Sequence, residues 1–322
     1  MLFTTLACPQ CGGVLPRQAS WRMVICPYCS ATVTRSKSVV EAVRFKEAKT
    51  RVLANARLAY AFTSCIVRWQ GQHLLVLKRL GIGESAEAYL AERMGPLPER
   101  VTLKLAHAAT LPDTLAREAE ILRALQQSRA PGAAYYAQRL PQVIGCGRTE
   151  GAGGHAREAL VLRHPSGYWG SLAHVLRYQS SGIDPRHGVW IWRRVLDLLS
   201  FAHASGWTHG DLSADHWLVH PRDHGIHLVG WAHARPNASP DAIARDLMQA
   251  AWTVRFLLCG GEELPTISHR IPAPLADLLR QSSEDADWCA RMGAMGVDQA
   301  LKAAAREAFG PPAFIPFNPT SA

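Results

Sequence analysis

A polar stretch in the second half of the sequence constrains the fold more than any other: His209 to Val219 reads H-G-D-L-S-A-D-H-W-L-V. It is preceded by Trp190 to Ala204, whose apolar residues recur at helical spacing and predict a buried helix. It is followed by the run I-H-L-V at Ile226 to Val229, which predicts a short strand. The sequence therefore predicts a loop that presents polar side chains between a buried helix and a strand.

This stretch resembles the catalytic loop of protein kinases, which runs His-Arg-Asp-Leu-x-x-x-Asn and is followed, after a short strand, by Asp-Phe-Gly. The resemblance implies that Asp211 is the catalytic residue that orients a substrate hydroxyl. It also puts His216 at the position of the metal-binding Asn and Gly230 at that of the metal-binding Asp. Because Mg²⁺ prefers oxygen ligands, we expect a degenerate site that holds Mg²⁺ poorly.

A second motif resembles the glycine-rich loop that lies over the phosphates in this family. The stretch L-L-V-L-K-R-L-G-I-G-E-S-A, from Leu74 to Ala86, has Gly81 and Gly83 in the first two glycine places. Ala86 occupies the third. The resemblance implies that the backbone amides of Gly81 and Gly83 approach a bound nucleotide.

Two further motifs complete the similarity to the nucleotide-binding half of a kinase. The strand pattern V-T-L-K-L-A puts Lys104 where the family has its phosphate-contacting lysine. The amphipathic helix pattern over 115–125 puts Glu118 where the partner of that lysine stands. The apolar stretch Ala159 to His164 resembles the strand and hinge that line an adenine pocket.

The region after the loop follows the family in one respect and departs from it in another. Asp246, near the start of a long helix pattern, corresponds to the aspartate that holds the backbone of the catalytic loop. Only thirteen residues, His233 to Arg245, precede it, fewer than protein kinases use for an activation segment and a peptide platform. Gly210 and Trp231 resemble instead the His-Gly-Asp and Asp-Trp signatures of aminoglycoside phosphotransferase-like kinases. A peptide substrate is therefore disfavoured.

The order of these motifs predicts an α+β fold: a bilobal protein kinase-like domain with a small β-rich N-lobe over 63–165 and a helical C-lobe over 166–308. Helices are expected around 272–282 and 284–308. The proline-rich C-terminal tail, 309–322, is expected to be extended and to dock through its aromatic residues on the body of the protein rather than on a partner.

Four cysteines near the N-terminus form two Cys-x2-Cys pairs separated by fourteen residues: Cys8, Cys11, Cys26 and Cys29. Four thiolates at this spacing can close a tetrahedral Zn²⁺ site and leave no open position for a substrate. The stretch resembles a zinc ribbon, predicted over 1–35, with a strand at 21–25 that delivers the second pair. The alternative is four free cysteines in a small core.

The net charge of +9 is concentrated in the first 60 residues. That segment has nine Lys and Arg against two Asp and Glu, whereas the other 262 residues have 26 against 24. Residues 36–62 lack Gly and Pro, carry an apolar stripe and are predicted to form a linker helix. A basic segment of this kind fits nucleic acid, an acidic protein partner or an anionic surface, or is simply a solvated helix face.

The composition is that of an ordinary globular protein of 322 residues with 48% hydrophobic residues. The sequence has no run of about 18 uncharged apolar residues, and cysteines fall where a signal peptide would need its apolar run. We therefore expect a cytoplasmic protein without membrane association.

Half of the fourteen histidines lie between residues 203 and 233, and we interpret them as ordinary polar or core histidines rather than a metal site.

Three hypotheses for the function follow. The favoured one is a zinc-ribbon pseudokinase, a regulatory or scaffolding protein with a protein partner, which lacks the usual metal ligands and binds ATP through Gly81, Gly83, Lys104 and Glu118. The second is an atypical active phosphotransferase that uses Asp211 as the base and another carboxylate for Mg²⁺. The third is an adaptor for nucleic acid or an acidic partner through residues 1–60. The implied cofactors are structural Zn²⁺ and ATP.

Overall fold

The computed structural model describes residues 23–25, 32–34, 65–95, 98–108, 110–150, 156–261, 267 and 270–320. The chain divides into two compact units, Met1–Ser64 and Cys65–Ala322. In the first unit, β1 (Met23–Ile25) pairs antiparallel with β2 (Thr32–Thr34), and the six residues between them include two of the four predicted zinc ligands. The four cysteines and the linker helix predicted at 36–62 lie outside the described residues.

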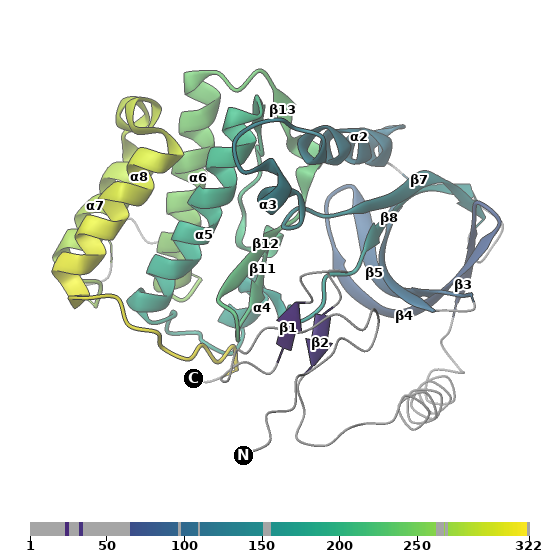
Figure 1. The fold of residues 1–322 in the computed structure, drawn as a ribbon, viewed down its shortest axis with the longest axis horizontal. Helices are drawn as coiled ribbons and strands as arrows, with labels where there is room; N and C mark the ends of the chain where they lie inside the picture. Colours follow the sequence, from purple (N-terminus) through teal and green to yellow (C-terminus); the bar gives the residue numbers. More distant parts are fainter. Residues whose placement is uncertain are drawn as a thin grey trace, which may run out of the picture. The chain divides into compact units, whose positions relative to one another are not determined.

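The second unit begins with a six-stranded antiparallel barrel (Figure 1). The strand order around it is β3, β4, β5, β6, β8, β7, and pairing of β3 with β7 closes the ring. Its strands are β3 (Ile66–Trp69), β4 (Gln72–Ile82), β5 (Ala86–Arg93), β6 (Glu99–Ala106), β7 (Val143–Glu150) and β8 (Ala156–Arg163). The predicted β-rich N-lobe is therefore a closed barrel, with β3 as an additional strand.

The inside of the barrel has a hydrophobic core of its own. Its largest member, Trp69, is 2% exposed and fills the space beside Gly145, where a Cβ would lie 2.6 Å from Cη2 of the indole. Gly145 is thus required by the close approach of β7 to this ring. The remaining members are Val67, Leu74, Ala91, Val101, Leu103, Leu105, Ala159 and Val161.

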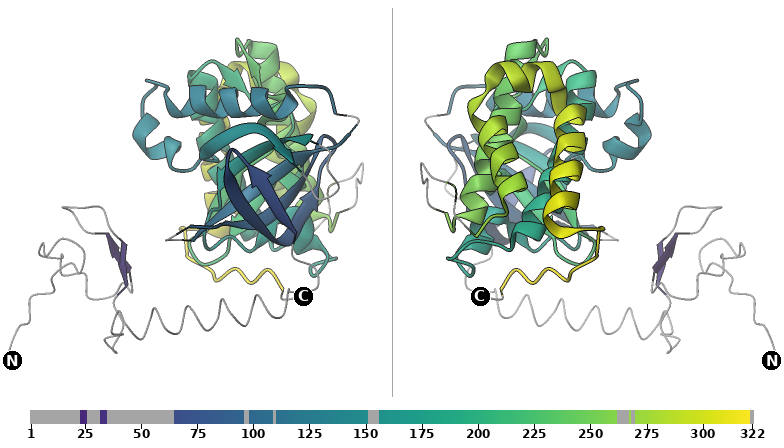
Figure 2. Two further views of the ribbon diagram at one scale, coloured as in Figure 1. Left: turned by 90° about the vertical axis from the view of Figure 1, so that its right-hand side faces the viewer. Right: turned by 90° about the vertical axis from the view of Figure 1, so that its left-hand side faces the viewer.

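One helix, α2 (Thr114–Gln126), packs against the outside of the barrel (Figures 1 and 2). Leu115, Leu122 and Leu125 recur at helical spacing and are fully buried, which explains why this segment is a helix with one inward face. A short helix, α3 (Ala133–Ala137), follows before the chain returns to the barrel. The apolar face of α2 belongs to the large core of the helical lobe.

The helical lobe is built around α5 (Pro185–Ala204) and α6 (Pro240–Leu258), which pack on one another and on later helices (Figure 1). Asp184 and Ser239 cap them by accepting backbone hydrogen bonds, and each cap precedes a proline at the first helical position. The other helices are α4 (Leu172–Leu176), α7 (Ala273–Glu284) and α8 (Ala286–Phe309), the last interrupted at Gly293.

Short strands and 3-10 turns connect the lobes and form the loops of interest. One sheet has the order β12, β11, β9, and β10 pairs with β13. Their bounds, with the two 3-10 turns, are β9 (Gly170–Ser171), β10 (Trp207–Thr208), η1 (Ala214–His216), β11 (Trp217–His220), β12 (Gly225–Leu228), η2 (Trp231–His233) and β13 (Arg235–Pro236).

The C-terminal tail runs back along the helical lobe (Figure 1). Phe317 is 6% exposed, and its ring centroid lies 4.8 Å from that of His187 and 5.7 Å from that of Trp190. Phe314 stacks on His224 with centroids 4.3 Å apart. The prediction that the tail docks on the body of the protein is confirmed. None of the helices in the described part of the chain combines the length and apolar character needed to cross a bilayer.

Candidate functional site

The loop from His209 is held by a buried aspartate on α6. Asp246 is 1% exposed, and its two carboxylate oxygens accept hydrogen bonds from the backbone N–H groups of His209 at 2.8 Å and Gly210 at 2.9 Å. The ring of His203 donates to the same carboxylate at 2.9 Å. Burial works to raise the pKa of Asp246, but these hydrogen bonds outweigh it and lower the pKa. The expected loop-holding role of Asp246 is confirmed.

His209 holds the loop in place through two hydrogen bonds of its ring. Its Nδ1 accepts a hydrogen bond from the backbone N–H of Asp211 at 3.2 Å, so the proton is on Nε2, which donates to the carbonyl of Val229 at 3.1 Å. The ring is fully buried and meets Trp231 edge-on, with centroids 4.6 Å apart. Burial lowers the pKa of His209 to about 4, so this imidazole is neutral at pH 7.

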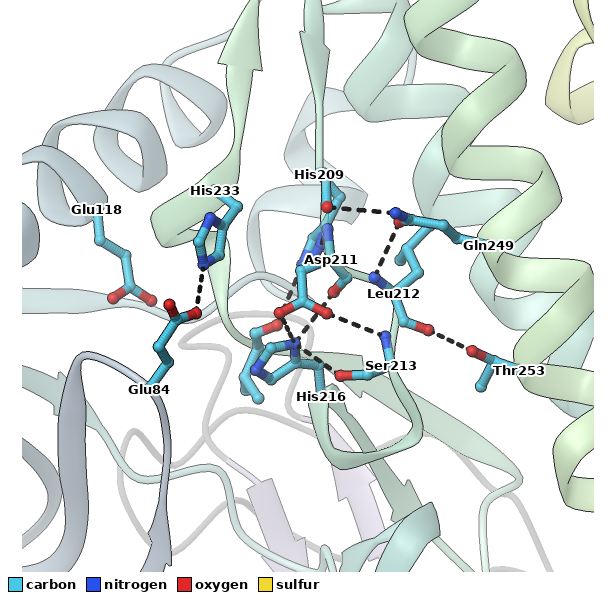
Figure 3. Close-up of polar contacts among 12 residues, drawn as sticks. Glu84, Glu118, His209, Asp211, Leu212, Ser213, His216, His233, Gln249 and Thr253 are labelled. Atoms are coloured by element: carbon cyan, nitrogen blue, oxygen red, sulfur yellow. Dashed lines mark hydrogen bonds and ion pairs between the residues drawn. The ribbon is translucent and has the colours of Figure 1, made fainter. Parts of the chain in front are cut away.

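The carboxylate of Asp211 is paired with the imidazole of His216 (Figure 3). Nδ1 of His216 lies 3.3 Å from Oδ2 of Asp211, 3.0 Å from the carbonyl oxygen of Asp211 and 3.3 Å from the hydroxyl of Ser213. Because the carbonyl only accepts, Nδ1 carries a proton. The residue at the catalytic position is therefore not free, since its carboxylate is already paired with the imidazole of His216.

The two partners shift one another's pKa in opposite directions. The hydrogen bond from His216 is the main cause that lowers the pKa of Asp211 well below its usual range. Burial works to lower the pKa of His216, but the hydrogen bonds and charge of Asp211 outweigh it and raise the pKa. Both shifts favour the ion pair over the neutral pair.

Gly230 gives the ring of His216 its space. The residue has φ +83°, and a Cβ built on it would lie 2.6 Å from Cδ2, 2.6 Å from Nε2 and 2.7 Å from Cε1 of His216. These three consecutive ring atoms are almost equally distant from the Cβ position, so the face of the ring lies over Gly230. A side chain at position 230 would have to begin inside the imidazole.

Lys104 on β6 and Glu118 on α2 form an ion pair. The carboxylate is almost completely buried, whereas the ammonium group reaches it from a partly exposed side chain. Glu118 lies on the inward face of α2 beside Leu122, and that face also packs on the turn that contains Trp231. The structure therefore brings together two of the residues predicted to bind a nucleotide, and α2 is the element that positions them.

The glycine-rich turn between β4 and β5 is fastened to the barrel beside it. Its backbone hydrogen bond, from Gly83 N to Ala86 O at 2.8 Å, closes a tight hairpin. The ring of His107 hydrogen-bonds to the carbonyl of Gly83 at 2.9 Å, and the hydroxyl of Thr110 donates to the backbone carbonyl of Ser85 at 2.6 Å. Gly81 lies earlier, within β4, opposite Ala88.

A contact also joins this turn to the helical lobe. Glu84 is 88% exposed at the tip of the hairpin, and its carboxylate lies 3.7 Å from Nε2 of His233 on η2 (Figure 3). Neither Glu84 nor His233 was predicted as a site residue, and nor were His107 and Thr110. Their neighbours in space are remote in sequence, so no local motif indicates them.

The stretch predicted to line an adenine pocket alternates between two sides of the barrel wall. Ala159 and Val161 belong to the barrel interior, whereas Leu160 and Leu162 belong to the core of the helical lobe. His164 follows, and its Nδ1 lies 3.0 Å from the hydroxyl of Thr102 on β6. Only every second residue of the predicted stretch therefore faces the side on which Lys104 lies, since strand side chains alternate.

The segment after η2 leads directly to α6. In β13, Arg235 and Pro236 lie opposite Thr208 and Trp207 of β10. The N–H of Ala238 then donates to the carbonyl of Gly206 at 3.2 Å, and the next residue caps α6. Residues 234–239, all of which the structure describes, contain one two-residue strand and no helix.

Within the described ranges, no three His, Cys, Asp or Glu side chains come together as a group that could hold a metal ion. Asp223 contacts His220 and Arg222 in the turn between β11 and β12. His187 and His224 stack with the C-terminal tail. The predicted zinc ligands Cys8, Cys11, Cys26 and Cys29 lie outside the described residues.

A crystal structure of the Toxoplasma gondii specific rhoptry antigen kinase domain is similar to this chain, with a TM-score of 0.57. The similarity covers 80% of this chain and 91% of that one, at 12% sequence identity. The chain has a protein kinase-like fold. The bilobal kinase-like arrangement predicted from the motif order is thereby confirmed. No protein family profile matches the sequence of this kinase-like chain, and no curated protein matches it.

Proposed function

We propose that this kinase-like chain is a pseudokinase, which binds a nucleotide and acts through a protein partner instead of transferring phosphate. The observation that carries the proposal is the Asp211–His216 ion pair lying over Gly230. Kinases use the positions of Asp211, His216 and Gly230 for catalysis and metal binding, and here these three residues contact one another instead.

The ion pair works against base catalysis. A general base is most effective when its pKa lies near the working pH, and the pKa of Asp211 is lowered instead. To accept a proton, the carboxylate would also have to give up its contact with the imidazolium of His216. Both effects reduce the reactivity of a substrate hydroxyl at this residue.

Mg²⁺ does not fit the residues present. The position of one metal-binding oxygen is taken by an imidazole, and that of the other by a glycine whose Cβ space the same imidazole fills. Mg²⁺ needs near-octahedral oxygen coordination, and carboxylates are its usual protein ligands. Asp211 is the carboxylate within reach, and it is already paired.

The proposal of nucleotide binding is supported by the Lys104–Glu118 pair. A lysine held by a buried carboxylate presents its remaining N–H groups in a fixed direction, as a phosphate contact requires. Gly81 and Gly83, at the end of β4, would let the backbone approach the phosphates without side chains between.

The test is to measure ATP binding by thermal shift together with ATP turnover. We expect ATP to raise the melting temperature, and turnover to stay at the level of the Asp211→Asn variant. Robust turnover that Asp211→Asn abolishes would contradict the proposal. Nucleotide binding should be lost in Lys104→Met with Glu118→Gln, in which neither buried charge is left unpaired. Lys302→Met, on the exposed surface of α8, is the matched control.

An active phosphotransferase is the second candidate, favoured by the intact scaffold of the loop. Asp246 still fixes the backbone at His209 and Gly210, so Asp211 is presented as the fold requires. In that case the imidazole of His216 would have to swing away in the presence of substrate. Activity that survives Asp211→Asn unchanged would exclude this candidate.

The N-terminal unit is proposed to be a zinc ribbon that supplies a contact for the partner. The supporting observation is the β1–β2 hairpin, in which Val24 lies opposite Val33 and the intervening residues include Cys26 and Cys29. A hairpin that brackets a Cys-x2-Cys pair is a usual support for structural Zn²⁺. With four thiolates bound, the basic segment keeps a positive charge for an acidic protein partner or nucleic acid.

A further inference from the structure

The departures from the kinase pattern at His216 and at Gly230 depend on one another. The imidazole covers Gly230 so closely that a Cβ there would lie 2.6 Å from ring atoms. A ring in this place and a carboxylate side chain at position 230 exclude one another. The two departures from the kinase pattern are therefore coupled, and the space that a metal-binding carboxylate would need is filled by a cationic side chain.

The orientation of the ring leaves one nitrogen, Nε2, for a ligand. Nδ1 is engaged by the carbonyl and the carboxylate of Asp211. Nε2 lies on the other side of the ring, and among the described residues no acceptor receives a hydrogen bond from it. His216 is 25% exposed, so part of its ring is open to solvent. A protonated imidazole held in this way presents one N–H with a positive charge behind it.

Lys104 provides a cation. Its charge has a small lowering effect on the pKa of His216, after the larger effects of burial and of Asp211. The other groups that face His216 are Asp211 and Ser213 on its own loop and the neutral ring of His209, whose centroid is 6.2 Å away. Lys104 and His216 reach this space from β6 and η1, so an anion between them would contact both lobes.

We propose that the His216 imidazolium replaces the metal ion, and that the site binds the phosphates of a nucleotide through His216 Nε2 and Lys104 Nζ without a divalent cation. The inference rests on the proposed nucleotide binding and deepens it. Its chemical basis is the charge-assisted hydrogen bond, which provides both charge and direction to a phosphate oxygen. The ligand class is an unchelated di- or triphosphate, in contrast to the magnesium complex that kinases bind.

The experiment measures the affinity of the full chain for ATP by calorimetry, once with EDTA and once with excess Mg²⁺. We expect ATP to bind at least as tightly in EDTA as in Mg²⁺. His216→Asn should weaken binding in EDTA at least tenfold, because a charge-assisted hydrogen bond is lost. His220→Asn, in the neighbouring hairpin, is the matched control and should bind like the unaltered chain.

The double variant His216→Asn with Gly230→Asp restores the residues that the kinase pattern has at the two metal positions. It should bind ATP at least tenfold more tightly with Mg²⁺ than with EDTA, because oxygen ligands replace the imidazolium. If it does not fold, the His216→Asn result alone decides. Inorganic triphosphate serves as a second probe: its binding in EDTA supports a phosphate site, and ATP binding without it supports a site that also needs the nucleoside.

Two outcomes would overturn this inference alone. One is ATP binding by the unaltered chain only in Mg²⁺, which would leave the proposed nucleotide-binding pseudokinase standing. The other is ATP affinity of His216→Asn in EDTA within threefold of that of the unaltered chain. Absence of ATP binding under both conditions, with the chain folded as judged by circular dichroism, would overturn this inference and the proposed nucleotide binding together.

Discussion

At the scale of single residues, the site is defined by complementary shapes and charges. His216 fills the space above Gly230 and donates a hydrogen bond to Asp211, so one side chain changes both the metal position and the catalytic position. A change at either residue alone leaves a hole or a clash. The pair must therefore be altered together if the site is to be returned to the kinase pattern.

The first prediction concerns Gly230→Ala, which should lower the free energy of unfolding by about 3 kcal/mol, from positive-φ strain and overlap with the His216 ring. Gly206→Ala is the matched control, because Gly206 has φ +82° and no atom within 4 Å of its Cβ position. Strain alone should cost it about 1–2 kcal/mol. Urea denaturation of the full chain measures both.

The contribution of the contact between the His216 ring and position 230 can be measured separately in a His216→Ala variant. With His216→Ala present, the overlap is removed, and the cost of Gly230→Ala should fall to that of Gly206→Ala. Equal costs for the two glycines in the unaltered chain would contradict the assignment of the ring to this space.

The sequence indicated part of the site, including the Lys104–Glu118 pair, but not the contacts that the other residues make. Lys104, Glu118 and Asp211 each lie in a local pattern, so their positions in the fold could be predicted. The pairing of Asp211 with His216 depends on a side-chain torsion that no pattern encodes. The contact of Glu84 with His233 joins residues about 150 positions apart, and only the tertiary fold brings them together.

At the scale of elements, one helix was predicted to within a residue at each end. The pattern over 115–125 became α2, Thr114–Gln126, because its buried face sets both ends. The helix predicted from Trp190 begins five residues earlier, at Pro185, where Asp184 caps it. The dipeptide Asp-Pro was the available signal. The four-residue strand β3 was missed, although its alternating burial pattern and the Gln70-Gly71 turn that joins it to β4 were available signals.

The second prediction concerns the docked tail. Burial lowers the pKa of His187 to about 4, and burial also lowers that of His224, so both rings are neutral where they stack on Phe317 and Phe314. A histidine free in solution has a pKa of about 6.5. The docked state is therefore fully stable above pH 6.5 and loses stability as the pH falls toward 4, because the undocked state takes up protons.

Hydrogen exchange in residues 310–320 measures this effect. We expect exchange, corrected for its intrinsic pH dependence, to accelerate as the pH falls from 6.5 to 4.5. Phe317→Ala removes the buried ring and should exchange rapidly throughout this range. His187→Asn should flatten the profile of the tail. A profile independent of pH in the unaltered chain would show that these rings do not control docking.

At the scale of the whole molecule, the chain combines two units with different origins of stability. Among the described residues, both hydrophobic cores are formed by residues of the second unit, from Val67 to Phe317. The predicted ribbon, 1–35, is short, and a domain of fewer than about 40 residues usually needs a metal or disulfides to fold. The predicted Zn²⁺ would supply that stability through four thiolates.

The third prediction follows from this difference. The purified chain should contain one Zn²⁺, and a strong chelator should remove it without changing the main thermal transition, which belongs to the kinase-like unit. Elemental analysis and calorimetry measure the two quantities. Cys26→Ser should reduce the zinc content, and Cys259→Ser, a free cysteine of the second unit, should not. A chain without zinc, or unchanged zinc in Cys26→Ser, would contradict the ribbon.

The closed barrel limits how the kinase-like unit can respond to a ligand. An open sheet can flex or shear along its free edges, but a ring has a fixed circumference, because any slip in one ladder must be matched in all the others. The hairpin of β4 and β5 therefore cannot bend over a ligand independently of the wall. We therefore expect adjustment in the turn at residues 83–85 and in the segments that join the barrel to the helical lobe, with the barrel itself responding as one body.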